Sequence, residues 1–138
     1  MTTELLAPAV GQEALVAAVQ SGAYAVYMGF GAFNARRSAR NFSDEEFRAA
    51  VFYCHLRGAK VYLTLNTLVT DRELPALAAE ARTASECGVD AILVQDWGVL
   101  ATLQKIIPDV PLHASTQMSL HPPAGAQEAA SLGRPRAV

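Results

Sequence analysis

Cysteine is scarce in this sequence, and its scarcity argues against several classes of site. The 138 residues include two cysteines, Cys54 and Cys87, which form neither a Cys-x-x-Cys pair nor another metal-ligand spacing. Both fall within expected helices. We therefore interpret them as core thiols and expect no metal site built from them.

An excess of charge of one sign and long apolar runs are also lacking. Eleven basic and thirteen acidic side chains give a formal net charge of −2, which favours neither nucleic acid nor a membrane surface as a partner of the whole chain. Any site for a polyanion must therefore be local. No apolar run approaches the roughly 20 residues that span a bilayer, and residues 1–4 lack the basic start of a secretory signal. We expect a cytoplasmic protein that does not contact membranes.

What the sequence does contain is a repeated unit of an amphipathic helix, a glycine and a short apolar strand. The glycines are Gly22, Gly58, Gly88 and Gly133, each at an expected helix end, where glycine adopts the left-handed conformation without steric cost. The strands are expected at residues 4–7, 25–28, 60–65, 91–94 and 112–114, and the helices at residues 12–21, 44–56, 71–87, 98–107 and 124–132. Capping boxes are indicated by Ser43 with Glu46 and by Thr70 with Glu73.

The strands are short and mostly apolar, as is typical of strands covered on both faces by helices, and their alternation with helices predicts an α/β domain with a parallel sheet. Two architectures fit this pattern, an open doubly wound sheet and a closed barrel. Polar residues after several strands favour the barrel, which builds its active site from many strand ends. A barrel needs eight strands, but the sequence reaches only the start of a sixth, near Arg136. We therefore expect residues 1–138 to form the first five to six βα units of a TIM-type barrel, incomplete as it stands because of truncation.

The connection between the second strand and the second helix, residues 29–42, is much longer than usual for such a unit. Arginine and asparagine side chains there could grip phosphate or carboxylate. We assign Asn34, Arg36, Arg37 and Asn41 to substrate binding. The alternative is a solvated loop whose arginines pair with acidic residues of the next helix.

Polar side chains follow the third and fourth strands. Asn66 is assigned to substrate binding, although it could instead hold its own turn. Gln95 and Asp96 would lie at the mouth of the barrel, with Gln95 binding substrate and Asp96 acting as a catalytic acid or base. Asp96 could also simply cap the next helix.

The fifth strand carries the densest polar stretch. His113 and Ser115 would share one face of the strand, with Gln117 at its rim. We assign His113 to catalysis and the other two residues to substrate binding, while a hydrogen-bonded core histidine is the simpler alternative for His113. A Ser/His/Asp hydrolase could be assembled from Ser115, His113 and Asp96, but the sequence lacks a Gly-x-Ser-x-Gly nucleophile elbow.

Six stretches of the sequence, which follow one another in the same order as in the family, together resemble the U-32 peptidases, historically called collagenase-like proteases. The stretches are residues 4–9 (ELLAPA), 22–29 (GAYAVYMG), 33–36 with 41–43 (FNAR and NFS), 63–68 (LTLNTL), 89–96 (VDAILVQD) and 113–118 (HASTQM). The pair Pro122-Pro123 departs from the family, which more often has asparagine after the histidine.

The resemblance implies a barrel whose better understood relatives are oxygen-independent hydroxylases or their partners. Such members modify uridine in transfer RNA, cytidine in ribosomal RNA or the ring of a ubiquinone precursor, and prephenate is implicated as a donor in the RNA branch. Several hold an iron–sulfur cluster, but Cys54 and Cys87 match none of the cluster cysteines. The resemblance therefore implies no cofactor in this chain and a possible cluster in a full-length parent.

Three functions stay open at this point. The parent could hydroxylate an RNA base or a small-molecule precursor, with the loop arginines contacting phosphate and the polar strand ends lining the site. It could instead be a collagenase-like peptidase with a catalytic serine, histidine or aspartate. It could also be a non-enzymatic accessory barrel that needs a second family member as its partner.

Overall fold

The computed structural model describes residues 3–35, 42–131 and 136–137 of the chain. Within them, strands and helices alternate as the sequence predicts. The elements are β1 (Leu6–Pro8), α1 (Gln12–Gln20), β2 (Ala25–Met28), α2 (Asp44–Leu56), β3 (Lys60–Leu65), α3 (Leu74–Glu86), β4 (Ala91–Val94), α4 (Trp97–Ile106), β5 (Leu112–Ala114), the short 3₁₀ helix η1 (Thr116–Met118), α5 (Pro123–Ser131) and β6 (Arg136–Ala137).

The strands form one parallel sheet in the order β1-β2-β3-β4-β5-β6, so each strand pairs with its neighbours in sequence. Pro8, Tyr27, Tyr62 and Ala91 lie opposite one another across the first four strands. A doubly wound sheet would reverse its strand order at a switch point, whereas a barrel adds strands in one direction. The sheet is therefore barrel-like, and over the described residues it is open between β1 and β6.

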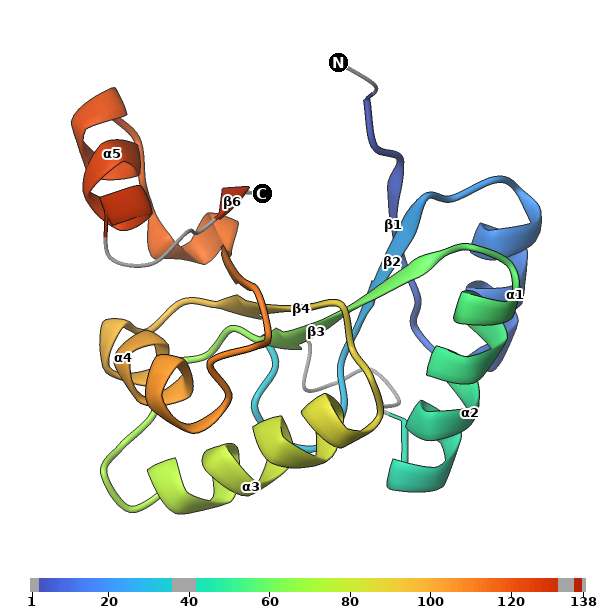
Figure 1. Cartoon of the computed structure of the whole chain (residues 1–138), viewed down its shortest axis with the longest axis horizontal. Helices are drawn as coiled ribbons and strands as arrows, with labels where there is room; N and C mark the ends of the chain where they lie inside the picture. The colour runs from blue at the N-terminus through green and yellow to red at the C-terminus, as the bar shows by residue number, and fades with distance from the viewer. Residues whose placement is uncertain (1–2, 36–41, 132–135, 138) are drawn as a thin grey trace.

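Helices α1 to α4 lie along one side of the curved sheet (Figure 1). Helices on one side of the sheet are what the expected barrel requires. A strand in a barrel faces helices on one side and the barrel interior on the other, so both of its faces can carry apolar side chains. α5 lies farther out, beside the end of the sheet near β6 (Figure 1).

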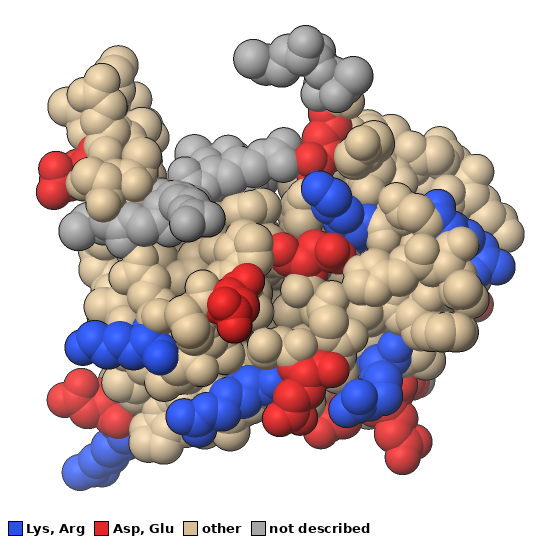
Figure 2. All heavy atoms as spheres, in the orientation of Figure 1, with Lys and Arg blue, Asp and Glu red and all other residues tan. Residues whose placement is uncertain are grey.

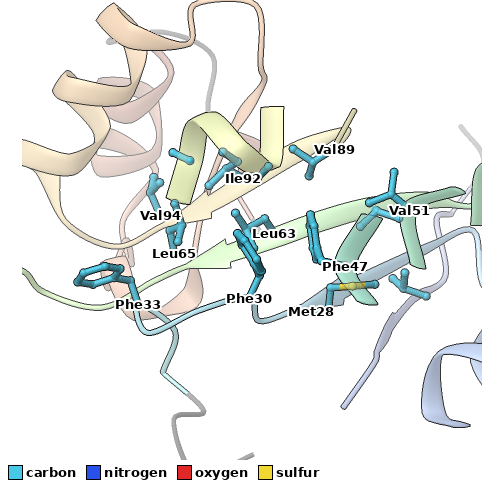
Figure 3. Close-up of a cluster of buried hydrophobic side chains, with 14 of the residues drawn as sticks. Met28, Phe30, Phe33, Phe47, Val51, Leu63, Leu65, Val89, Ile92 and Val94 are labelled. Atoms are coloured by element: carbon cyan, nitrogen blue, oxygen red, sulfur yellow. The ribbon is translucent and has the colours of Figure 1, made fainter. Parts of the chain in front are cut away.

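The main hydrophobic core lies between the sheet and the helices. Met28, Leu63 and Ile92 stand at the same level of β2, β3 and β4, and all three side chains are buried in this core. Figure 3 shows them beside Phe47 and Val51 of α2. Phe47 is fully buried, and burying such a side chain stabilises the fold by roughly 1.5–3 kcal/mol.

A smaller cluster of buried side chains lies on the opposite face of the sheet. It consists of Ala25, Tyr62, Ala91 and Leu93, with Leu6 and Tyr27 packed against it. Side chains alternate between the two faces of a strand, so these positions would face the interior of a closed barrel. This second face carries the polar residues discussed below.

The helix ends confirm one expected capping box and correct the other. The Oγ atom of Ser43 accepts a hydrogen bond from the backbone N–H of Glu46, whose carboxylate accepts one from the Ser43 N–H. Thr70 instead donates both its backbone N–H and its hydroxyl to the Glu73 carboxylate. No side chain within the described residues caps this helix, which begins at Leu74 rather than at residue 71.

The expected glycine turns and core thiols are confirmed where the structure describes them. Gly22, Gly58 and Gly88 have φ angles of 89°, 73° and 84°. Cys54 is buried and Cys87 is half-buried, and both are free thiols. Burial, helped by the negative charge of Asp90, raises the pKa of Cys54 to about 11, which suits an inert core position. None of the described helices is long and apolar enough to cross a membrane.

Candidate functional site

Asn66, directly after β3, joins three segments at the carboxyl ends of the strands. Its Oδ1 atom accepts a hydrogen bond of 3.0 Å from the backbone N–H of Ala35, in the connection between β2 and α2. Its Nδ2 atom donates to the Oγ atom of Ser115, after β5, at 3.3 Å. Parallel strands end at the same edge of a sheet, and Asn66 uses that geometry to bridge over the end of β4. We call Asn34, Asn66, Gln95, Asp96, Ser115 and Gln117 the polar rim.

Ser115 holds the end of β5 in place and is 5% exposed. Its backbone N–H donates to the carbonyl of Val94 at 2.8 Å, which continues the strand pairing. Its Oγ atom also accepts a bond of 3.4 Å from the backbone N–H of Gln117, capping η1. A hydroxyl oxygen that accepts two bonds keeps its proton available for a third group. Gln117 itself has an exposed side chain.

Asp96 serves as the N-cap of α4, the structural alternative that its sequence position allowed. Its Oδ1 atom accepts hydrogen bonds from the backbone N–H groups of Gly98 and Val99 at 2.7 and 3.1 Å. A cap of this kind is worth about 1 kcal/mol of stability. One carboxylate oxygen makes both bonds, so the catalytic assignment of Asp96 stays a prediction. Gln95, the residue before it, is half-buried.

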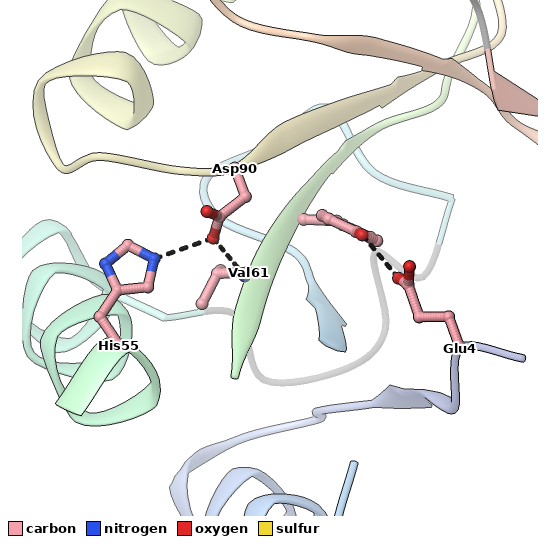
Figure 4. Close-up of polar contacts among 5 residues, drawn as sticks. Glu4, His55, Val61 and Asp90 are labelled. Atoms are coloured by element: carbon pink, nitrogen blue, oxygen red, sulfur yellow. Dashed lines mark hydrogen bonds and ion pairs between the residues drawn. The ribbon is translucent and has the colours of Figure 1, made fainter. Parts of the chain in front are cut away.

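His113 lies deeper than the polar rim, on the same strand face as Ser115, and it is 8% exposed. Its ring meets the ring of Tyr62 edge to face, with centroids 5.0 Å apart. The Tyr62 hydroxyl donates to the Oε1 atom of Glu4 at 2.6 Å, one of the contacts drawn in Figure 4. The sequence analysis missed Tyr62 and Glu4, although alternation along residues 60–66 would have placed Tyr62 on the face of Asn66. The catalytic role of His113 stays a prediction.

Glu80 of α3 is a third residue that the sequence analysis missed, and it contacts the connection after β2. Its Oε2 atom accepts a hydrogen bond of 3.3 Å from the backbone N–H of Ala32. Burial raises the pKa of Glu80 to about 7; the Ala32 N–H opposes this shift and the charge of Asp44 adds to it. An acidic side chain in the middle of a helix gives no sign in the sequence that a distant loop will cover it.

Of the four residues on the long connection that were assigned to substrate binding, Asn34 is among the described residues. Asn34 is 2% exposed, so it lies within the protein. Arg36, Arg37 and Asn41 lie outside the described residues. Both ends of the connection are anchored, because Phe30 and Phe42 form a parallel bridge and Phe30 stacks on Phe47 at a centroid distance of 4.8 Å.

Comparison with known proteins now decides the family. The family model of peptidase family U32 matches residues 11–138. The chain belongs to peptidase family U32. The expected resemblance is thereby confirmed.

Three curated proteins that are similar to this chain carry different functional names. The chain is 41% identical over 119 residues to a 23S rRNA 5-hydroxycytidine synthase of Escherichia coli, with 85% of this chain and 17% of that protein covered. It is 36% identical to tRNA hydroxylation protein P1 of Bacillus subtilis and 33% identical to a collagenase of Porphyromonas gingivalis. Each of those two alignments covers 85% of this chain and 28% of the relative. The chain thus spans less than a third of the length of these relatives.

Solved structures confirm the barrel-type fold of the U32 chain. A U32 peptidase structure matches with a TM-score of 0.74 at 17% identity, covering 96% of this chain and 56% of that one. The protein CutC of Streptococcus agalactiae matches with a TM-score of 0.78 at 16% identity, covering 98% of this chain and 71% of that one. Identities this low speak to fold and not to chemistry.

The U32 chain does not by itself fit an iron–sulfur cluster. Such clusters are commonly held by four thiolates, whereas this chain has two cysteines, one of them in the main core. The described residues also contain no group of three or more histidine, cysteine or acidic side chains that could hold a metal ion. Figure 2 shows positive and negative side chains interspersed over the described part of one face, without a patch of one sign.

Proposed function

We propose that this U32 chain forms part of the barrel and one side of the substrate site of a protein that hydroxylates a base in RNA. The observation that carries the proposal is the 41% identity to a ribosomal RNA hydroxycytidine synthase over 85% of the chain. The tRNA hydroxylation relatives support the same reaction class. RNA as substrate would place the reaction in the cytoplasm.

Within this proposal the residues of the polar rim take different roles. The amide oxygen and nitrogen of Asn66 bond to Ala35 and Ser115, so we assign Asn66 to shaping the site and not to contacting the base. Gln95 and Gln117 have amides suited to the edge of an unstacked base. Asp96 and His113 are the acid–base candidates, since both can exchange protons.

The remaining assignments concern phosphate, cofactor and partner. We propose that Arg36 and Arg37 contact the RNA backbone, with Asn34 and Asn41 orienting the same connection. An iron–sulfur cluster, if the reaction uses one, would have to be held by residues outside this chain. A second U32 protein could supply such residues as a partner subunit, and its co-purification with this chain would support that arrangement.

Nucleoside analysis of cells that lack the gene tests the proposal. Ribosomal and transfer RNA are digested and their hydroxylated pyrimidines are measured by mass spectrometry before and after deletion. We expect one hydroxylated nucleoside to disappear, to return with the wild-type gene and to stay at least tenfold reduced with Gln95→Ala or His113→Ala. Phe52→Ala, a change at an exposed position of α2, is the matched control and should restore it fully. Unchanged hydroxylation after deletion would overturn the proposal.

The collagenase relative favours a second candidate, a peptidase. In that case Ser115 would be the nucleophile, with His113 or Asp96 as the base. The structure gives each of these three side chains another contact: Ser115 caps η1, Asp96 caps α4 and His113 packs on Tyr62. Cleavage of a collagen peptide that is lost with Ser115→Ala would establish this candidate, and absence of cleavage by the wild-type protein would end it.

A further inference from the structure

The segment 31–35 is held from two sides before it reaches the polar rim. On one side the backbone N–H of Ala32 bonds to Glu80 of α3. On the other side the backbone N–H of Ala35 bonds to Asn66. Asn34 lies between these two anchors and is buried. One carboxyl group and one amide thus contribute to the position of the segment, together with Phe33, which is buried in the main core.

Glu80 fits closely beneath this segment. Gly31 has a φ angle of 68°, and a Cβ atom at this position would overlap the Glu80 carboxylate. The Oε1 atom of Glu80 is buried and has no hydrogen-bond partner within the described parts of the chain. An ionised carboxylate with only one bonded oxygen in such a place is costly, whereas a neutral carboxyl group is tolerated. The fit therefore suits the protonated side chain.

We propose that Glu80 is a positioning residue whose protonated form holds residues 31–35 against α3, and whose ionisation releases them. The inference rests on the proposed function only in giving that segment a role at the substrate site. Release would disturb the bond between Ala35 and Asn66, and through Asn66 the placement of Ser115. Glu80 itself need not touch the substrate.

The charges around Glu80 agree with this behaviour. The negative charge of Asp44, in the first turn of α2, opposes the ionisation of Glu80. The hydrogen bond from the Ala32 N–H favours the ionised form of Glu80. Asp44 is the charged group that acts on Glu80 within residues 3–35 and 42–131. The arginines at 36, 37 and 40 belong to the same connection and lie outside the described residues. On balance, burial dominates, so release is expected near neutral pH.

Hydrogen exchange measured by mass spectrometry or NMR tests the proposal on the wild-type chain without any substrate. With half-ionisation at a pKa of about 7, the protonated fraction of Glu80 falls roughly tenfold between pH 6 and pH 8. After correction for intrinsic exchange, the protection of Ala32 and Ala35 should fall by up to about tenfold over this range, while the protection of β3 stays constant. Equal protection of residues 31–35 at pH 6 and pH 8 would overturn the proposal.

Two variants of α3 sharpen the test. Glu80→Gln keeps the shape of the neutral side chain, so segment 31–35 should stay protected at both pH values. Glu86→Gln, an exposed position on the same helix, is the matched control and should behave as wild type. A Glu80→Gln variant that kept the wild-type pH dependence would also overturn the proposal.

Activity separates this proposal from the proposed function. If the protein hydroxylates RNA, the kcat/KM of the wild type should fall as the pH rises above about 7. This fall should be smaller in Glu80→Gln. If no RNA hydroxylation exists, the exchange measurement still decides the role of Glu80. The two proposals therefore fail on different readouts.

Discussion

At the amino-terminal end of the strands, Asp90 accepts hydrogen bonds from the backbone N–H of Val61 at 2.7 Å and from the His55 ring at 2.8 Å (Figure 4). At the carboxyl-terminal end, the bridging residue is the neutral amide of Asn66, which bonds to the buried hydroxyl of Ser115. The first arrangement is charged and close to water, since the side chains of His55 and Asp90 are 40% and 30% exposed. The second is uncharged and partly buried.

The difference shows where ionisation carries a penalty. A carboxylate near water keeps its solvation, so Asp90 can join a helix to a strand at little cost. Near the carboxyl-terminal end, Glu80 is half-buried with its Oε1 atom enclosed, and burial raises its pKa to about 7. Strongly shifted groups gather at functional sites, although structural networks also shift them. The comparison therefore assigns stability to the amino-terminal end and candidate chemistry to the other.

The largest expected effect comes from opening the main hydrophobic core. Phe47→Ala would empty a fully buried position that also stacks on Phe30, at the start of the long connection. We expect the free energy of unfolding to fall by about 3–5 kcal/mol, measured by urea unfolding and circular dichroism. Phe52→Ala, at a side chain that is 66% exposed, should change it by less than about 0.5 kcal/mol. Equal effects of the two variants would contradict this packing.

Breaking the contacts of Asp90 at the amino-terminal end of the strands should lower stability but leave the proposed RNA hydroxylation unchanged. Asp90→Ala leaves the Val61 N–H without its acceptor at a partly buried position. We expect a loss of about 1–3 kcal/mol in the free energy of unfolding. Asp71→Ala, in an exposed turn, is the matched control and should be close to neutral. Loss of the proposed RNA hydroxylation in a folded Asp90→Ala variant would contradict the assignment of stability to one end of the strands and of chemistry to the other.

Glu80 gives the carboxyl-terminal end a pH dependence of stability. Its pKa in the folded chain, about 7, lies above the ordinary value of 4.5, so the folded state binds the proton more tightly. The stabilisation is complete below pH 4.5 and is lost as the pH rises through 7. After allowance for solvent screening, we expect a decline on the order of 1–2 kcal/mol in the free energy of unfolding. Glu80→Gln should remove this part of the decline, and a variant that declines as steeply as wild type would argue against it.

The sequence predicted the fold better than the site, for a physical reason. Alternating apolar strands and helix-ending glycines are local patterns, so β2, β3, β4 and β5 appear where they were expected. The bridge from Asn66 to Ser115 joins residues after two different strands, and only the sheet order brings them together. Glu80 was missed because its burial depends on a distant loop. Tyr62 was missed because it was counted as an ordinary apolar strand residue.

The smallest expected effect distinguishes the two bonds of Asp90. His55→Ala removes the ring but leaves the bond from the Val61 N–H to Asp90 intact. The pair with His55 is partly exposed, and pairs of this kind contribute roughly 0–1 kcal/mol, less at high salt. We therefore expect a loss of less than about 1 kcal/mol in the free energy of unfolding at low salt, shrinking further in about 1 M salt. A loss as large as that of Asp90→Ala would mean that the contact with His55, and not the bond from the partly buried Val61 N–H, is what makes Asp90 important at this end of the sheet.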